Sequence, residues 1–247
     1  MPRDTATELE PVPEDWRRGL AVAAHPDDLE YGTASAIARW TAQGKDITYV
    51  LVTDGEAGID GMEPGRAGPL RRDEEIRSAQ LVGVETVEFL GHPDGLVEAG
   101  HVLRRDLAAA IRRHRPEVVI GINFREHFGG PGWNHVDHRN LGVALLDATR
   151  DAANRWLFTD LLDEGLEPWA GMRFVAFGNS PDSGHGVDVT DSIDAGVASL
   201  EAHRVYLDSL PEGTLGTDPD GFLRDMARSV GPRLGLELAV PFEVIPV

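Results

Sequence analysis

Short apolar runs alternate with helical patterns along most of the chain, and this alternation limits the possible folds more than any other feature. The first run, residues 19–24, carries no charge, and a second, residues 47–53, follows a helical pattern over residues 29–43 that stops at Gly44. Apolar strands without polar alternation are typical of a parallel sheet covered by helices on both faces. Strand, helix and strand in this order predict a right-handed parallel crossover.

The alternation continues through the middle of the chain. It predicts helix 71–82, strand 87–90, helix 99–114, strand 117–122 and helix 135–153. Two long segments, 54–69 and 123–133, contain many glycines and are expected to be loops. Together these elements predict an α/β fold, a Rossmann-like and mostly parallel sheet with helices on both faces.

The C-terminal part of the chain has a less regular pattern. Strands are expected at 172–177 and 187–189, and a helix at 192–207. The last segment, 236–247, is apolar but contains Pro241 and Pro246, which favours an edge strand over a central one. No repeat or linker is visible, so residues 1–247 are expected to form one domain with an N-terminal extension over residues 1–18.

Composition excludes several classes of function. Lysine and arginine number 23 against 42 aspartates and glutamates, which gives a net charge of −19. Such a charge repels nucleic acid and anionic lipid surfaces, so neither is an expected partner. There is no run of about eighteen apolar residues and no signal-like segment, so we expect a cytoplasmic protein without membrane insertion. Because the chain has no cysteine, any metal must be bound by His, Asp or Glu.

Two polar clusters follow strands of the predicted sheet. The first is His25-Pro26-Asp27-Asp28, after the strand at 19–24. A solvated loop with an aspartate as helix N-cap would explain this pattern. However, two adjacent carboxylates in a crevice cost several kcal/mol unless a cation or hydrogen bonds offset the charge.

The second cluster is Asn134-His135-Val136-Asp137-His138-Arg139, after the strand at 117–122 and its glycine-rich loop. Two histidines three positions apart at a helix start lie on nearly one face. Taken alone, they would be read as a surface pair. Because ligands of open α/β sheets bind at the carboxyl ends of the strands, both clusters are expected at one place. Two histidines and an aspartate leave positions open, as in a catalytic zinc or other divalent-metal site.

The two motifs resemble those of a known family. Residues 24–30, Ala-His-Pro-Asp-Asp-Leu-Glu, are similar to the AHPDDxE signature of the LmbE-like, or PIG-L, family of zinc-dependent N-deacetylases, and residues 135–138 to its HxDH signature. The resemblance extends through most of the chain, with Arg72 and Glu75 similar to an RxxE helix, Asp94-Gly95 to a DG turn, and Ala202-His203-Arg204 to an AHRSQ segment.

The resemblance implies a role for each residue of the two motifs. It implies that His25, Asp28 and His138 bind the metal, Zn²⁺ or another divalent ion such as Fe²⁺. It also implies that Asp27 is the general base and that His135 is a general acid or oxyanion stabiliser. The spacing alone does not decide whether Asp27 or Asp28 is the ligand. Asp137 is expected to orient the His135 ring.

The remaining motifs are weaker. By resemblance, Arg72, Asp94 and His203 would bind substrate, although the same residues would also suit a surface ion pair, a Pro-Asp-Gly turn and a packed helix. The family often has a lysine where Gly196 falls and a Ser-Gln pair where Val205-Tyr206 falls. Contacts from that helix therefore do not transfer to this chain.

These observations lead to one hypothesis and two alternatives. The resemblance implies a zinc-dependent hydrolase that removes an acyl group, acetyl in the simplest case, from an N-acylated amino sugar or related glycoconjugate, a small-molecule substrate. The family also implies a homo-oligomer, a trimer or hexamer. A non-haem iron oxygenase with a His/Asp/His triad is the first alternative, although such sites usually lie on β-barrels. The second is a catalytically silent metal- or sugar-binding module.

Overall fold

A computed structural model describes residues 8–247 except 212 and 215. The predicted N-terminal extension lies partly outside the described residues, in 1–7. Its described part joins the domain, because β1 (Glu10–Pro11) pairs in parallel with β7 and Trp16 is buried in the core.

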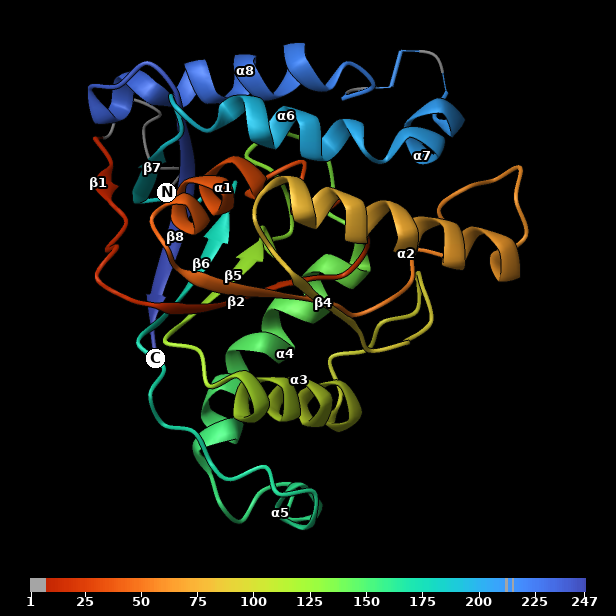
Figure 1. Ribbon diagram of the computed structural model, residues 1–247, viewed down its shortest axis with the longest axis vertical. Coiled ribbons are helices and arrows are strands. Elements are labelled where there is room, and N and C mark those ends of the chain that lie inside the picture. Colours follow the sequence, from red (N-terminus) through yellow and green to blue (C-terminus); the bar gives the residue numbers. More distant parts are fainter. Residues whose placement is uncertain (1–7, 212, 215) are drawn as a thin grey trace.

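The eight strands of the described chain form one sheet, in the order β1-β7-β8-β6-β5-β2-β3-β4 (Figure 1). All neighbouring strands are parallel except for the two pairs that include β8. This confirms the Rossmann-like α/β prediction. The remaining strands are β2 (Arg18–Ala23), β3 (Asp46–Leu51), β4 (Thr86–Phe89), β5 (Val118–Ile122), β6 (Phe174–Gly178), β7 (His185–Asp188) and β8 (Ala239–Pro246).

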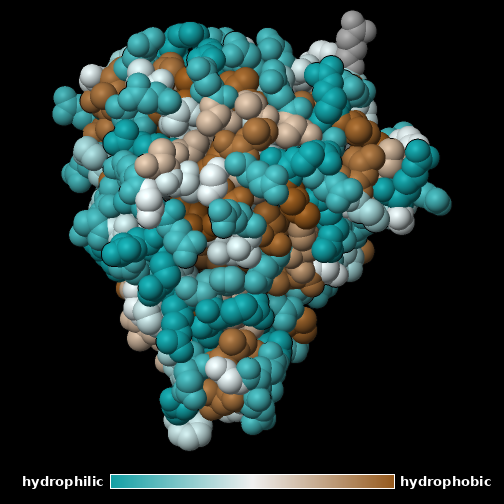
Figure 2. Space-filling view, viewed as in Figure 1, coloured by the Kyte–Doolittle hydropathy of each residue, from teal (hydrophilic) through white to brown (hydrophobic). Residues whose placement is uncertain are grey.

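Helices cover both faces of the sheet, and each face has its own apolar core (Figure 1). One core includes side chains of α1 (Ala34–Ala42), α2 (Pro64–Leu81), α6 (Ile193–Glu201), α7 (Arg204–Ser209) and α8 (Pro219–Val230). The other includes side chains of α3 (His101–His114), α4 (Val136–Ala153) and α5 (Asp160–Asp163). A 3₁₀ helix, η1 (Gly231–Leu234), precedes β8. The continuous apolar strands of the sequence are explained by this double cover. The face of the molecule shown in Figure 2 is largely hydrophilic, with apolar patches between the polar side chains.

The structure corrects the expectation that β8 is an edge strand. It lies between β6 and β7 and is antiparallel to both. Pro241 is tolerated there because its carbonyl accepts the N–H of Asn179, just beyond the last β6 pair at Gly178. The N–H that proline lacks would point the same way, past the end of β6, so no ladder bond is lost.

The expected loop over 54–69 is also partly wrong, because α2 already begins at Pro64. Proline is favoured at the first position of a helix, where the N–H needs no partner. Pro69 lies inside the helix and leaves the Gly65 carbonyl without its usual donor. Both residues are exposed, so water can serve that carbonyl.

The predicted helix 192–207 is divided in two. The helix α6 ends at Glu201, and His203 is the N-cap of α7, with its backbone outside the helical region at φ −81° and ψ 44°. The break directs the His203 side chain into the protein, where it is fully buried.

Candidate metal centre and active site

The two polar clusters meet at the carboxyl edge of the sheet. His25 to Asp28 follow β2, and α4 begins immediately after His135, in the connection that leaves β5. These strands are neighbours and parallel, so their carboxyl ends lie side by side. Asp94 joins the group from the loop after β4.

His25, Asp28 and His138 bring three potential ligand groups together. Nε2 of His138 lies 3.0 Å from a carboxylate oxygen of Asp28 and 3.3 Å from Nδ1 of His25. Nδ1 of His25 lies 3.3 Å from the other oxygen of Asp28. The three side chains are only 8–15% exposed. The backbone N–H of His25 donates to Asp28 at 2.8 Å, so the local turn itself directs the aspartate to this place.

The outer nitrogens of both imidazoles have partners that fix the tautomers. Nδ1 of His138 lies 3.0 Å from the side-chain oxygen of Asn134, which can only accept. Nε2 of His25 lies 3.1 Å from Asp94 and 3.1 Å from Asp137. Both outer nitrogens therefore donate, and in the neutral rings the inner nitrogens hold the lone pairs that a metal would take, as in metal-binding histidines.

Two other groups of potential ligands share His25. One adds Asp94 and Asp137, and the other adds His135 and His138. In the first group, Asp137 already accepts the N–H groups of Gly95 and Val97, at 2.8 and 3.1 Å. Because these bonds occupy its oxygens, this carboxylate is better suited to hold His25 than to bind an ion.

His135 stands at the open side of the cluster. It is the exposed N-cap of α4, and its ring centre lies 5.3 Å from that of His25 and 5.6 Å from that of His138. Nδ1 of His135 accepts the backbone N–H of Asp137 at 3.3 Å. The HxDH resemblance predicts that the Asp137 carboxylate orients His135, whereas in the structure that carboxylate contacts His25. The start of α4 explains this difference, because the first turn of the helix directs the Asp137 side chain toward the sheet and leaves His135 exposed to solvent.

Asp27 is buried beside the cluster in a strained conformation. Its φ is +89°, in the left-handed region that costs a non-glycine residue about 1–2 kcal/mol. Nη2 of Arg71 lies 3.0 Å from Oδ2 of Asp27, although this oxygen accepts no hydrogen bond from the described residues. Burial raises the pKa of Asp27 to about 6, against the lowering effect of Arg71. The group is therefore a stronger base than an ordinary aspartate.

Sequence reasoning did not single out Arg71. Its side chain is 3% exposed, and it donates to the carbonyls of Pro26 and Gly55, at 2.5 and 3.1 Å. Arg72, the residue named by the resemblance, is 44% exposed and pairs with Asp54 at 3.1 Å. The spacing of polar residues on α2 could have indicated that Arg71 faces inward. Arg71, Glu74, Glu75 and Ser78 are spaced three and four apart, which places them on one face of the helix, and all are buried.

Two further predicted substrate ligands lie in different surroundings. Asp94 contacts His25 through one oxygen and accepts the N–H of Ala57 at 2.8 Å through the other. His203 is fully buried, 3.6 Å from Glu75 and 3.8 Å from Glu30. The role of Asp94 in substrate binding stays a prediction, whereas His203 is not placed to touch a substrate directly in this structure.

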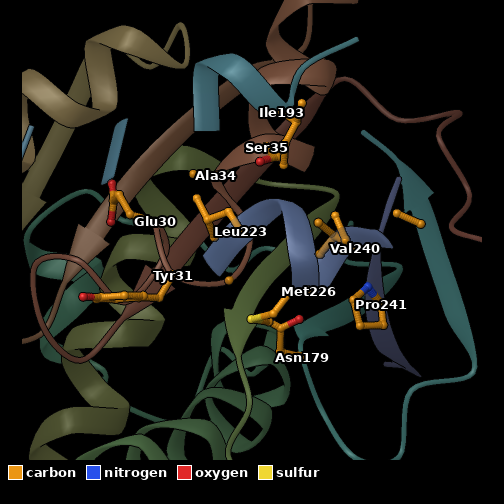
Figure 3. A pocket seen from close by; sticks show the side chains of 13 residues that line it. Glu30, Tyr31, Ala34, Ser35, Asn179, Ile193, Leu223, Met226, Val240 and Pro241 are labelled. Atoms are coloured by element: carbon orange, nitrogen blue, oxygen red, sulfur yellow. The ribbon is translucent and has the colours of Figure 1, made fainter. Parts of the chain in front are cut away.

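Two pockets in the described part of the structure differ greatly in size. A small one of about 20 Å³ lies among α1, α6, α8 and β8 and has room for about one water (Figure 3). A larger one of about 500 Å³ is lined by Arg139 and Val143 of α4, by residues 124–127 and by Pro181 and Asp182. Only the larger pocket could accept a sugar-sized molecule.

The comparison with known families agrees with the two motifs. The sequence profile described as PIG-L, GlcNAc-PI de-N-acetylase, matches residues 20–149, which include both clusters. The chain belongs to the PIG-L family. None of the helices in the described residues is long and apolar enough to cross a lipid bilayer.

Several PIG-L relatives have known activities. The chain is 29% identical over 235 residues to diacetylchitobiose deacetylase of Thermococcus kodakarensis, covering 94% of this chain and 84% of that protein. The solved structure of N,N'-diacetylchitobiose deacetylase from Pyrococcus horikoshii is similar with a TM-score of 0.84 and 26% identity, over 94% and 85% of the two chains. The 1D-myo-inositol 2-acetamido-2-deoxy-alpha-D-glucopyranoside deacetylase of Thermobifida fusca is 31% identical over 165 residues, 56% of each protein.

Proposed function

We propose that this PIG-L protein is a zinc-dependent hydrolase that removes an acyl group, acetyl in the simplest case, from an N-acylated amino sugar or glycoconjugate. The observation that carries the proposal is the convergence of two imidazole nitrogens and one carboxylate within 3.0–3.3 Å. The named relatives, which are deacetylases of acetylated amino sugars, support the substrate class.

The donor set fits a divalent cation. His25 would bind through Nδ1, His138 through Nε2 and Asp28 through its carboxylate, and no thiolate is needed. Nitrogen and oxygen donors suit zinc, and three protein ligands leave a position open for catalysis. When bound, the ion would polarise the amide carbonyl and lower the pKa of a water. Side chains of the protein would supply the base that takes the proton of the water and the acid that protonates the departing nitrogen.

Asp27 would accept the proton of the attacking water. It directly precedes Asp28 in the chain, and its Oδ2 is free of hydrogen bonds in the described structure. The neighbouring guanidinium of Arg71 restrains the carboxylate without removing its basicity.

His135 would protonate the departing nitrogen. Because Nδ1 of its ring accepts the N–H of Asp137 at 3.3 Å, the neutral ring carries its proton on Nε2. To act as an acid, the ring would first take a second proton on Nδ1 from solvent, which opens this long hydrogen bond. The proton on Nε2 can then pass to the departing nitrogen and leave a neutral ring. His135 is exposed, so Nε2 is open to a substrate. An amine is a poor leaving group without such a proton, so this residue is needed for cleavage of the C–N bond.

The substrate would contact the loop between β5 and α4. Trp133 is 67% exposed there, and the guanidinium of Arg139 lies 5.0 Å from its ring centre. The 500 Å³ pocket begins on the same part of α4. An exposed aromatic ring beside a polar pocket suits a sugar ring, which has both apolar and hydroxyl-bearing faces.

Acetate release tests the proposal directly. The zinc-loaded protein would be incubated with diacetylchitobiose and N-acetylglucosamine, alongside the Asp27→Asn variant and the exposed control Asp73→Asn on α2. We expect wild type and control to release acetate and Asp27→Asn to be slower by at least a hundredfold, the usual contribution of a general base. Equal rates in wild type and Asp27→Asn would eliminate Asp27 as the base. A metal-bound protein inactive on a broad amide panel would favour a binding module.

A further inference from the structure

Three buried ionisable side chains lie behind Asp27, away from the proposed metal ligands. They are Glu30, Glu75 and His203, and each is at most 1% exposed. Nε2 of His203 lies 3.8 Å from a Glu30 oxygen and 3.6 Å from Oε2 of Glu75. They come from three separate sequence motifs, and the proposed chemistry uses none of these three residues.

Neighbouring serines hold this cluster to two helices. Ser78 of α2 donates to Glu30 at 2.5 Å, and its hydroxyl lies 2.7 Å from that of Ser199 on α6. His203 follows α6 directly, so its position depends on the same packing. The cluster therefore ties the turn after β2 to α2 and α6.

Direct contact between the cluster and a sugar is excluded by its burial. Glu75 and His203 have no exposed surface. Glu30 lines the small pocket of Figure 3, whose volume of about 20 Å³ is far below that of a sugar. Any effect on the reaction must pass through another residue.

Glu75 provides this connection. Its Oε2 accepts the backbone N–H of Asp27 at 3.2 Å, and the same oxygen faces His203. Asp27 has the positive φ of +89°, a conformation that persists only where the surroundings impose it. The Glu75 carboxylate is thus an acceptor placed at the strained residue that carries the proposed base.

We infer that Glu75, which lies beside His203, is a positioning residue that accepts the Asp27 N–H and thereby holds the left-handed backbone that presents the Asp27 carboxylate to the site. The inference rests on the proposed hydrolase function. It predicts that loss of the acceptor at position 75 lowers kcat while KM and bound zinc change little.

Glu74 provides a matched control on the same helix. It is 1% exposed, and its Oε1 accepts a backbone N–H as Glu75 does, but from Val205 at 2.7 Å. Glu75→Met and Glu74→Met each remove one buried carboxylate that accepts a backbone N–H. Glu75→Gln keeps an oxygen that can accept the Asp27 N–H.

The kinetic experiment compares these variants after unfolding temperature and zinc content have been measured. We expect Glu75→Met to lose tenfold or more in kcat with KM within twofold of wild type, Glu75→Gln to retain at least a third of kcat, and Glu74→Met to keep kcat. His203→Gln should lose severalfold in kcat. If kcat falls equally in Glu74→Met and Glu75→Met, in step with their stability, the cluster only stabilises the fold and the inference is wrong.

Hydrogen exchange at the Asp27 amide tests the same inference without catalysis. In the folded protein, we expect exchange at this amide to be at least tenfold faster in Glu75→Met than in wild type, Glu75→Gln or Glu74→Met. Unchanged exchange in Glu75→Met would overturn the inference. If the wild type released no acetate from any substrate, the proposed function would fail, and this exchange result would still decide whether Glu75 holds Asp27.

Discussion

The carboxylate of Asp137 lies 3.1 Å from Nε2 of His25, although 112 positions separate the two residues in the chain. This contact keeps a proton on Nε2, so the neutral His25 ring has its lone pair on Nδ1, which faces Asp28 and His138. Oδ2 of Asp137 faces both His25 and the Gly95 N–H, and Oδ1 accepts the Val97 N–H, so the amide NH₂ of an asparagine would oppose either the first two donors or the third. We expect Asp137→Asn to weaken zinc binding about 10–100-fold, the usual effect of losing such a partner.

Competition with a chelating dye would measure the zinc affinity of Asp137→Asn. Asp106→Asn is a suitable control, because Asp106 holds His92 in a similar pair at 3.0 Å outside the cluster. Equal zinc affinity in wild type and Asp137→Asn would show that the Asp137 carboxylate does not set the His25 tautomer.

His135 should affect catalysis without affecting the metal. We expect His135→Gln to lower kcat about 10²–10⁴-fold, because a positioned proton donor contributes this much to a rate. Zinc content should stay at the wild-type level. His101→Gln, which changes an exposed histidine at the start of α3 that lines neither pocket, should keep its activity. Loss of zinc in His135→Gln would instead place His135 among the ligands.

Much of the fold could be predicted because its signals are local. The apolar strands β2, β3 and β5 and the helices between them each carry their pattern in a short window. The place of β8 could not be predicted this way. The position of β8 depends on where β6 and β7 end relative to Pro241. These two strands lie far from Pro241 in the sequence, so no short window of residues carries the information.

The candidate site could likewise be predicted only in part from local sequence patterns. His25, Asp28 and His138 could be placed together because the carboxyl ends of adjacent parallel strands must meet. The roles of Arg71 and Arg72 could not be told apart from the sequence. The two residues are adjacent on α2, so turning the helix by one position would exchange the arginine that faces inward. The partner of Asp137 depended on the loop after β4, whose path has no local signature.

The pH dependence of stability should change when Glu75 is replaced by glutamine. Burial, together with the nearby Glu30, raises the pKa of Glu75 well above its ordinary value of 4.5. The folded protein therefore holds this proton more tightly than the unfolded chain does. Its contribution to stability is present below pH 4.5 and is lost as pH rises toward the folded pKa. Glu75→Gln cannot lose a proton, so it avoids this loss.

We expect the unfolding free energy of Glu75→Gln, relative to wild type, to rise between pH 5 and pH 8. For each pH unit of this range that lies between 4.5 and the folded pKa of Glu75, the unfolding free energy of the variant should gain about 1.4 kcal/mol over that of the wild type. Urea titrations of the metal-free proteins would measure it, with the exposed Glu85→Gln as control. A constant difference between Glu75→Gln and wild type at both pH values would contradict a raised pKa at Glu75.

The close packing of α6 on α1 predicts a stability effect at Gly196. A Cβ at this position would lie 2.0 Å from Oγ and 3.0 Å from Cα of Ser35, so backbone has to move to accept it. We expect Gly196→Ala to destabilise the protein by about 1–3 kcal/mol. Gly65→Ala, in a helical position with open space around it, should instead be neutral or stabilise by up to about 1 kcal/mol. Calorimetry of the two variants checks both signs. If Gly196→Ala were as stable as Gly65→Ala, α1 and α6 could not approach as closely as the Ser35 contact requires.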